Sequence, residues 1–264
     1  MIRVGVIGAA GKMGRQVCQA VHADPGLILA AAIDSTHAGT PVGRLTGDPS
    51  ITVEISDELD RLSDAEVEVA VDFTHPKVVK DNVRWCIRHA IHAVVGTTGL
   101  SAADLDDIRG LIDEEGNESN VFVAPNFAVG AVLMMAFARR AAKHLPNVEI
   151  IELHHDGKAD APSGTALRTA EGIVAERGEP RPLAMGETHP GARGAAVGGI
   201  RVHSVRLPGL VAHQEVILGG PGETLSIRHD SYDRESFMPG VVLAVKAVPS
   251  KPGLTLGLES LLDL

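Results

Sequence analysis

The glycine-rich turn after the first apolar run is the feature that most constrains the fold of this chain. Residues 2–7, IRVGVI, form a short run typical of a buried parallel strand. Residues 8–14, GAAGKMG, follow at once and lead into a segment with apolar side chains at helical spacing. Strand, glycine turn and helix in this order are the context that a dinucleotide-binding fold requires. The N-terminal part is therefore predicted to be a parallel α/β domain that binds a dinucleotide.

The glycines of this turn stand at positions 8, 11 and 14, so their spacing is GxxGxxG instead of the usual GxGxxG. Their physical roles are still available. Gly8 can form the tight turn, Gly11 lets backbone approach a pyrophosphate, and Gly14 lets the helix pack on the sheet. A structural turn that binds nothing is the alternative, and the placement between strand and helix favours binding.

A carboxylate follows the second predicted strand, residues 27–33. Asp34 lies twenty residues after Gly14, where a carboxylate can accept hydrogen bonds from the ribose hydroxyls of NADH. Lys12 and Arg15 lie close to the same turn and could instead pair with the 2′-phosphate of NADPH. The residues therefore leave both NADH and NADPH open as the cofactor.

Three later apolar runs, residues 67–73, 92–95 and 121–123, are predicted to be further strands of this sheet. Residues 39–50 are predicted to be a loop, because they are rich in glycine, proline and threonine. Helices are predicted to begin near Thr74 and after Ser101.

Small and polar residues follow the last two of these strands. They are Gly96, Thr97 and Thr98 in the first case, and Ala124, Pro125, Asn126 and Phe127 in the second. Open α/β sheets bind ligands beyond the carboxyl ends of their strands, so these tips predict one cofactor crevice together with the glycine turn. Ordinary turns are the alternative for either tip alone.

The second half of the chain has a different pattern. A helix is predicted over residues 130–145, and residues 178–199 read as a long loop, either mobile or used in subunit contacts. Residues 148–153, 201–207, 210–218 and 224–229 then predict an open, mostly antiparallel sheet of about four strands, because apolar and polar residues alternate in the last three. A final apolar helix, residues 234–248, would be disturbed by Pro239 and Gly240 and would return to the first domain.

Residues 152–166, ELHHDGKADAPSGTA, carry the chemistry of this second half. A strand ends on His154 and His155, Lys158 follows, and a helix is predicted to begin at the PSGT sequence. A proton carrier, an ammonium group and the N–H groups of a helix start therefore lie within a few residues of one another. A surface pair of histidines and a solvated lysine are the alternatives. No metal is predicted, because no carboxylate or cysteine stands at zinc spacing.

The composition excludes several classes of protein. A net charge of −10 and an aromatic content of 3% argue against binding to nucleic acid or to an anionic membrane. Cys18 and Cys86 fall in predicted helices, which favours a reducing cytoplasm. We find no signal peptide and no run of transmembrane length, so a cytoplasmic enzyme is expected.

The sequences GAAGKMG, GTTG, APNF and ELHHDGKADAPSGTA together resemble the 4-hydroxy-tetrahydrodipicolinate reductase (dihydrodipicolinate reductase) family of bacterial lysine and diaminopimelate synthesis. The resemblance implies a Rossmann-type dinucleotide-binding domain, residues 1–127 and 236–264, and an α+β domain for substrate binding and oligomerisation, residues 128–235. It also implies a homotetramer that uses NADH or NADPH to reduce a cyclic imine dicarboxylate, a small-molecule substrate.

The same resemblance implies roles for individual residues. Gly8, Ala9, Ala10, Gly11, Lys12, Met13, Asp34, Gly96, Thr97, Thr98, Ala124, Pro125, Asn126 and Phe127 would contact the dinucleotide. His154 would be the proton donor with Lys158 as its catalytic partner, and the substrate would be held by His155, Lys158, Ser163, Gly164 and Thr165. Asp156 and Gly157 stand where many relatives carry a further histidine or a basic residue, so no third imidazole is implied. Arg234 matches a position near the substrate.

Two rival functions remain open at this point. Another NAD(P)-dependent reductase of amino-acid metabolism, such as a phosphorylating semialdehyde dehydrogenase, would need a thiolate nucleophile, and both cysteines lie inside predicted helices. A non-catalytic dinucleotide sensor would not need His154, Lys158 and the PSGT sequence to be intact.

Overall fold

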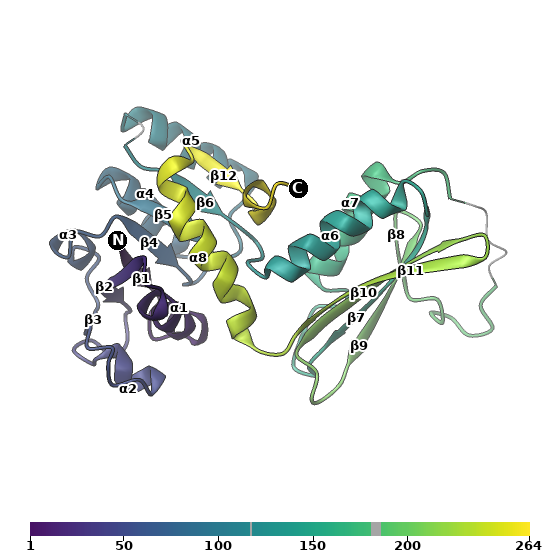
Figure 1. The fold of residues 1–264 in the computed structure, drawn as a ribbon, viewed down its shortest axis with the longest axis horizontal. Helices are drawn as coiled ribbons and strands as arrows, with labels where there is room; N and C mark the ends of the chain where they lie inside the picture. The colour runs from purple at the N-terminus through teal and green to yellow at the C-terminus, as the bar shows by residue number, and fades with distance from the viewer. Residues whose placement is uncertain (117, 181–185) are drawn as a thin grey trace. The chain divides into compact units, whose positions relative to one another are not determined.

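The computed structural model describes residues 1–116, 118–180 and 186–264. This chain divides into two compact units, residues 1–127 with 237–263, and residues 128–236 with Leu264. Figure 1 shows the helices and strands of both. The assignment of cofactor binding to the first unit, and of substrate binding and oligomerisation to the second, stays a prediction.

The first unit alternates strands and helices along the chain. Its N-terminal part contains β1 (Ile2–Ile7), α1 (Lys12–Ala23), β2 (Leu27–Ile33), α2 (Val42–Thr46), β3 (Ile55–Ser56), α3 (Arg61–Asp64), β4 (Val69–Asp72), α4 (Val79–Arg88), β5 (His92–Val95), α5 (Ala102–Glu114) and β6 (Val121–Val123). The chain returns to it with α8 (Met238–Ala247), the 3-10 turn η2 (Val248–Ser250), β12 (Leu254–Leu256) and η3 (Leu258–Leu261).

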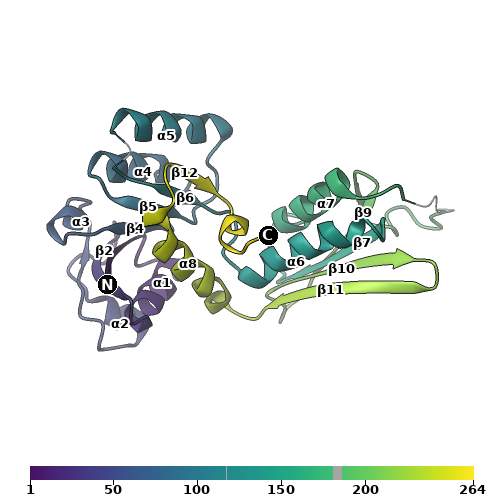
Figure 2. The same cartoon turned by 45° about the horizontal axis from the view of Figure 1, so that its top comes forward.

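Seven strands form the sheet of this unit, in the order β12-β6-β5-β4-β1-β2-β3, and all neighbouring pairs are parallel. Strand β1 pairs with β2 on one side and β4 on the other, so the strand order reverses beside the glycine turn. Helices α4 and α5 contact each other, as do α1 and α8, and Figure 2 shows the two pairs on opposite faces. The predicted Rossmann-type sheet is confirmed, and its switch point lies where a dinucleotide would bind.

Three predictions of local structure in this unit are wrong. Residues 39–50 are not all loop, because Val42 and Gly43 are buried and α2 forms between Pro41 and Gly47. The helix expected near Thr74 begins only at Val79. The helix expected over residues 234–248 is α-helical only from Met238, because residues 234–237 form a 3-10 turn; Pro239 lies in the first turn of α8, where a missing backbone N–H costs no helical hydrogen bond.

The second unit contains α6 (Val129–Ala142), β7 (Asn147–His154), α7 (Gly164–Glu176), β8 (Ala195–Val197), β9 (Ile200–Arg206), β10 (Ala212–Gly220), β11 (Glu223–Ser231) and the 3-10 turn η1 (Arg234–Phe237). Its sheet has the order β11-β10-β7-β9-β8, in which only the pair of β7 with β9 is parallel. The mostly antiparallel sheet is confirmed, with five described strands instead of about four.

Helices α6 and α7 cover one face of this second sheet. Val148 and Ile150 of β7 and Val216 of β10 form a buried cluster with Met134 of α6 and Ile173 of α7. The whole segment 178–199 was predicted to be a loop, but residues 195–197 of it form the strand β8. Residues 181–185 of this segment lie outside the described residues. Successive side chains of a strand point to opposite faces, so Val148 and Ile150 of β7 face the helices and the residues between them face away.

Candidate active site

The glycine turn after β1 is tight enough that side chains are excluded from two of its positions. Gly8 has a φ of +85°, and a Cβ there would lie 2.6 Å from the carbonyl oxygen of Phe73. A Cβ on Gly14 would lie 2.0 Å from the carbonyl oxygen of Gly8. Gly14 thus lets α1 pack closely against the turn at Gly8, whereas the spacing alone predicted that Gly14 lets the helix pack on the sheet. The turn needs glycine at both positions for steric reasons.

The N-terminus of α1 is suited to an anion. Gly11 is its N-cap residue, and among the described residues no side chain caps this end and no acidic residue lies in its first turn. Lys12 begins the helix, and Met13 follows. The free N–H groups and the positive end of the helix dipole therefore fit the pyrophosphate of a dinucleotide.

Asp34 is held beside this turn by hydrogen bonds. Its Oδ2 accepts a hydrogen bond from the backbone N–H of Ala10 at 2.9 Å, and its Oδ1 accepts two from Thr36 at 2.9 and 2.7 Å. The Nε of Arg15 donates to the carbonyl oxygen of Ala10 at 2.8 Å. The turn therefore brings together the carboxylate that favours NADH and a guanidinium that could bind the 2′-phosphate of NADPH.

Phe73, which sequence reasoning did not single out, joins the other predicted cofactor residues to the glycine turn. Its backbone touches Gly8, and its ring would clash at 2.1 Å with a Cβ on Gly96. The same ring packs against Phe127 with 5.9 Å between centroids. The turn after β1 and the tips of β5 and β6 therefore meet around one residue, Phe73.

Two of the predicted cofactor side chains also have structural roles. The Oγ1 of Thr97 donates to Asp72 Oδ1 at 2.8 Å and accepts from the backbone N–H of Thr74 at 2.7 Å. The Phe127 side chain is only 2% exposed. Because the side chains of Thr97 and Phe127 are buried and already have partners within the protein, a ligand at these two tips would meet mainly backbone atoms. Asp72 was missed, although a carboxylate that ends a buried strand signals such a network.

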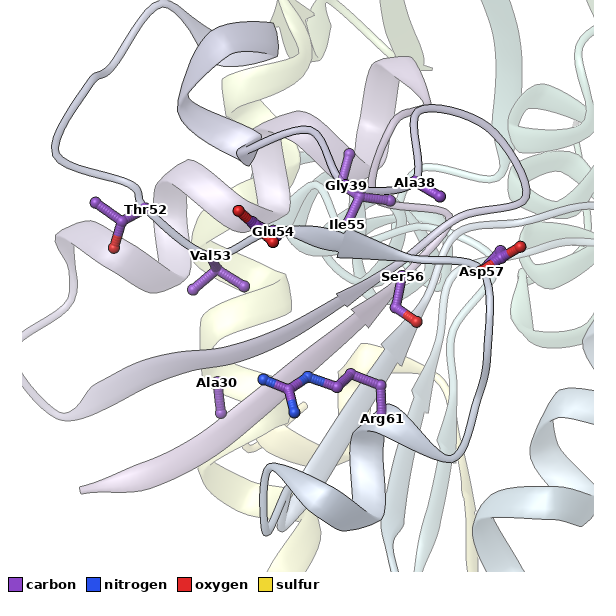
Figure 3. A pocket seen from close by; sticks show the side chains of 10 residues that line it. All are labelled: Ala30, Ala38, Gly39, Thr52, Val53, Glu54, Ile55, Ser56, Asp57 and Arg61. Atoms are coloured by element: carbon purple, nitrogen blue, oxygen red, sulfur yellow. The ribbon is translucent and has the colours of Figure 1, made fainter.

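A pocket of about 560 Å³ lies beside β2 and β3, bordered by Glu54, Ser56, Asp57 and Arg61 among others (Figure 3). None of the residues predicted to bind the dinucleotide lines it. The pocket adjoins the end of β2 through the hydrogen bond of Asp34 N–H to the Ser56 carbonyl oxygen, 2.9 Å long.

The second unit presents His154 at the end of β7. Its Nδ1 lies 2.5 Å from Oε2 of Glu152, and its side chain is 14% exposed. Burial lowers the pKa of His154, and the hydrogen bond to Glu152 opposes this only in part. His155 is exposed on the following loop. The two histidines therefore differ: one is anchored and nearly buried, and the other faces water.

Glu152 is a carboxylate that sequence reasoning missed. It is 0% exposed, and both of its oxygens accept hydrogen bonds from Arg206, at 2.9 and 2.8 Å. Burial alone would raise the pKa of Glu152, but hydrogen bonds from Arg206, Ser204 and His154 together hold it below its usual value. Glu152 is therefore ionised at neutral pH, and because a carboxylate oxygen only accepts, its hydrogen bond with His154 requires a hydrogen on Nδ1.

Lys158 and the start of α7 form an anion cradle. Lys158 Nζ lies 2.6 Å from Asp160 Oδ1, and the hydrogen bond from Lys158 is the main cause that holds the pKa of Asp160 below its usual value. Ser163 is the N-cap residue of α7, with its Oγ accepting from Ala166 N at 3.2 Å. Thr165 follows Gly164 in the first turn. The carboxylate of Asp160 therefore already pairs with the ammonium of Lys158 beside the start of α7.

The structure brings His154, Lys158 and Ser163–Thr165 to one end of the second unit, through Glu152 and Arg206. The N–H of Ser163 donates to Glu152 Oε1 at 3.2 Å, and Arg206 donates to the carbonyl oxygen of Asp160 at 2.6 Å. Arg234 lies in η1, and no contact between it and these residues is described. Among the described residues, no helix is long and apolar enough to cross a membrane, and no group of three or more His, Cys, Asp or Glu side chains could hold a metal.

A Rossmann-type unit whose glycine turn suits an anion, and a unit with a nearly buried imidazole near a lysine and a helix start, are what an NAD(P)-dependent oxidoreductase requires, and this chain belongs to that class. Comparison with family models gives the particular family. The model for the N-terminus of dihydrodipicolinate reductase matches residues 2–127, and that for its C-terminus matches residues 130–262. The chain belongs to the dihydrodipicolinate reductase family.

Full-length relatives agree with the family models. The chain is 52% identical over 268 residues to 4-hydroxy-tetrahydrodipicolinate reductase of Nocardia farcinica (strain IFM 10152), covering 100% of this chain and 99% of the relative. It is also 52% identical to the reductase of Mycolicibacterium gilvum (strain PYR-GCK), with 100% of both chains covered. A dipicolinate-bound dihydrodipicolinate reductase from Paenisporosarcina sp. TG-14 is 41% identical with a TM-score of 0.87, covering 98% of this chain and 99% of that one.

Proposed function

We propose that this chain reduces 4-hydroxy-tetrahydrodipicolinate, a cyclic imine dicarboxylate, to tetrahydrodipicolinate with NADH or NADPH, in lysine and diaminopimelate synthesis. The observation that carries the proposal is the placement of the His154 imidazole in the same unit as the Lys158 ammonium, which pairs with Asp160, and the N-terminus of α7. Full-length relatives that bear the reductase name support it.

The dinucleotide, when bound, would supply the hydride. The glycine turn, Lys12 and Asp34 of the first unit would bind its pyrophosphate and ribose groups. Predicted contacts at Gly96–Thr98 and Ala124–Phe127 would use mainly backbone atoms, because Thr97 and Phe127 are buried in structural contacts. The residues present therefore fit a dinucleotide.

The second unit would orient the substrate and supply the proton. Lys158 would pair with one substrate carboxylate, and the N–H groups of Gly164 and Thr165 with the hydroxyl of Ser163 would hold a carboxylate at the α7 N-terminus. His155 would add a contact from the loop. Holding a rigid ring at its carboxylates fixes which face meets the hydride, which is how orientation contributes to rate.

His154 would deliver the proton from Nε2, because Nδ1 is bonded to Glu152. Its lowered pKa leaves the imidazole largely neutral at neutral pH in the free protein. A dianionic substrate close to the ring favours the imidazolium form, so proton uptake would accompany substrate binding. Lys158 would stabilise the negative charge that develops in the transition state.

Two rival functions are less well supported. A phosphorylating semialdehyde dehydrogenase needs a thiolate, but Cys18 and Cys86 are buried, and burial raises the pKa of each thiol to about 12. Two unpaired, buried cysteines also suit a reducing cytoplasm, where we place the enzyme. A dinucleotide sensor would have no use for the ionised Glu152 and the anchored His154.

The proposed assembly is a homotetramer. Helices α6 and α7 cover one face of the second sheet, while the opposite face carries Ile151 and Leu153 of β7 and Ile217 of β10, all partly exposed. Charged residues such as Glu149 and Glu215 share this face with the three apolar ones, and no described helix of the unit covers it. Such an uncovered face, with partly exposed apolar residues, supports association through it.

The replacement of His154 by Gln tests the proposed role of the imidazole. Glutamine keeps a polar side chain of similar size but cannot donate a proton at neutral pH, so we expect kcat to fall about 100-fold or more. NADH binding, measured by fluorescence titration, should stay within about twofold because the dinucleotide would contact the other unit. Near-normal turnover in this variant would remove His154 as the proton donor.

A further inference from the structure

Glu152 lies on the face of β7 whose other buried side chains, Val148 and Ile150, are apolar. Val148, Ile150, Glu152 and His154 share the strand face that packs under α6 and α7, because successive side chains of a strand alternate between faces. Val148 and Ile150 belong to the buried cluster, and Glu152 is 0% exposed. An ionised side chain therefore takes up a core position, next to the proposed proton donor.

Both oxygens of this carboxylate are committed. Oε1 accepts from Arg206 Nη2 at 2.8 Å and from the backbone N–H of Ser163 at 3.2 Å, while Oε2 accepts from Arg206 Nη1 at 2.9 Å and faces His154 Nδ1 at 2.5 Å. Arg206 is held in turn by the carbonyl oxygens of Val205 and Asp160. Glu152 thus connects the imidazole, on one oxygen, with the N-cap residue of α7, on the other.

Stability alone does not account for such a group. A buried ion pair costs desolvation, and well-packed apolar residues of similar volume are often equally stable or more stable. A buried carboxylate that accepts from Nδ1 of a histidine does something an apolar residue cannot. It selects the tautomer with hydrogen on Nδ1, fixes the orientation of the ring and stabilises the imidazolium form.

We propose that Glu152, oriented by Arg206, is a positioning residue for the reductase reaction: it holds His154 with Nδ1 protonated and Nε2 free for proton transfer, and holds the ring in register with the α7 anion cradle through Ser163. The expected effect of Glu152 on the rate rests on the proposed function, but its effect on the tautomer and orientation of the His154 ring does not. Ring tautomer and ring pKa are properties of the free protein.

The chain offers a matched control on the same strand. Glu149 also contacts an arginine and a histidine, since it pairs with Arg193 and lies 2.8 Å from His203 Nε2. Its side chain is 35% exposed, and it points to the opposite face of the sheet. Glu149→Gln therefore removes a similar Arg–Glu–His contact without touching His154.

The experiment compares Glu152→Gln, Glu152→Asp and Glu149→Gln with the parent protein. Histidine-labelled ¹⁵N NMR spectra of the free proteins report the tautomer and pKa of His154, with the His154→Gln variant identifying its signals. Steady-state kinetics, cofactor titration and thermal unfolding are measured on the same preparations.

We expect the His154 signals of the parent to show hydrogen on Nδ1. In Glu152→Gln that preference is lost, the pKa of His154 falls further, and kcat falls about tenfold to 100-fold with NADH affinity unchanged. Glu152→Asp, which keeps the charge one methylene shorter, should recover part of both the Nδ1 preference and the rate. Glu149→Gln, which leaves the surroundings of His154 intact, should match the parent in the tautomer and pKa of His154 and in NADH affinity.

Three results would overturn the inference: a parent His154 with hydrogen on Nε2, a folded Glu152→Gln protein whose tautomer and rate equal those of Glu149→Gln, or equal rates in Glu152→Asp and Glu152→Gln. If Glu152→Gln does not fold, Glu152→Asp is compared with the parent alone, and an unchanged tautomer, ring pKa and rate would overturn it. A parent protein that shows the expected tautomer but reduces no substrate would refute the proposed function while leaving the positioning of His154 intact.

Discussion

At the residue scale, one imidazole between a buried carboxylate and an anion cradle sets the expected pH dependence. Burial lowers the pKa of His154 below the usual value of about 6.5, and its hydrogen bond to Glu152 offsets this only in part. The imidazolium, which is the form that donates a proton, is present below this pKa and is lost as the pH rises through it.

We therefore expect kcat/KM, which reports on the free enzyme, to decrease with rising pH from the acid side of about 6.5 upward. The corresponding decrease in kcat should occur at higher pH, because the bound dianionic substrate stabilises the imidazolium form of His154. Initial rates across the pH range measure both, and the His154→Gln variant serves as control because its residual rate should lack this decrease. A kcat/KM that rises over this range would oppose the assignment.

Asp160 pairs with the lysine of the cradle that the substrate would use, so its replacement by Asn should favour substrate binding. The carboxylate is paired with Lys158 at 2.6 Å, and the two side chains are 55% and 24% exposed. Partly exposed pairs contribute roughly 0–1 kcal/mol, so the KM for the dicarboxylate should fall up to about fivefold. Steady-state kinetics measure this, and a KM that rises instead would mean that Asp160 orients Lys158 for binding.

At the scale of elements, the turn between β1 and α1 depends on its glycines. A Cβ on Gly14 would lie 2.0 Å from the Gly8 carbonyl oxygen, so Gly14→Ala must shift α1 away from the turn. We expect a loss of roughly 1–3 kcal/mol in the free energy of unfolding and at least about tenfold weaker NADH binding.

Gly110→Ala in α5 is the matched control for this substitution. Gly110 is an exposed helical glycine, and a Cβ added there would meet no atom within 4 Å, so alanine should stabilise the protein by roughly 0.5–1 kcal/mol. Urea unfolding and cofactor titration measure both variants. Equal behaviour of Gly14→Ala and Gly110→Ala would show that the turn tolerates a side chain.

Elements marked by an apolar run or a local cap were predictable, even the three residues of β6, whereas β3, β8 and β12 were not predicted. The run of residues 2–7 is β1, and Ser101 caps α5 while its backbone N–H donates to the Asp104 carboxylate in return; both signals are local in the sequence. Strand β12 has three residues and exists by pairing with β6, more than 100 residues away in sequence. Such short elements form through tertiary pairing, so their own residues carry little signal.

The same limit applies to the site. His154, Lys158 and Ser163 were found because they fall within one short stretch of sequence, whereas Arg206 lies on another strand and reaches Glu152 only through the parallel pairing of β7 with β9. Glu152 did carry a signal that was not used. It lies two residues before His154 and continues the face of Val148 and Ile150, so a charged residue at an apolar position marked the network.

At the scale of the whole molecule, the proposed homotetramer depends on the sheet face that carries Ile151, Leu153 and Ile217. Ile217→Glu places a charge on this face, and we expect it to shift the mass measured by light scattering from tetramer toward smaller species. Phe137→Glu, at an exposed apolar residue of α6, should leave the mass unchanged. A parent protein that is monomeric at micromolar concentration would contradict the proposed assembly.

The central claim is that the two units together catalyse a substrate-dependent reduction with either dinucleotide. Asp34 and Arg15 both contact Ala10 at the glycine turn, so neither cofactor is excluded. The most direct measurement is the oxidation of NADH and of NADPH, in parallel, with the substrate generated in place by the preceding enzyme of the pathway. We predict one dinucleotide oxidised per substrate reduced, with kcat/KM values for NADH and NADPH within about 100-fold. Tight binding of both dinucleotides with no oxidation of either, in the presence of substrate, would contradict the account.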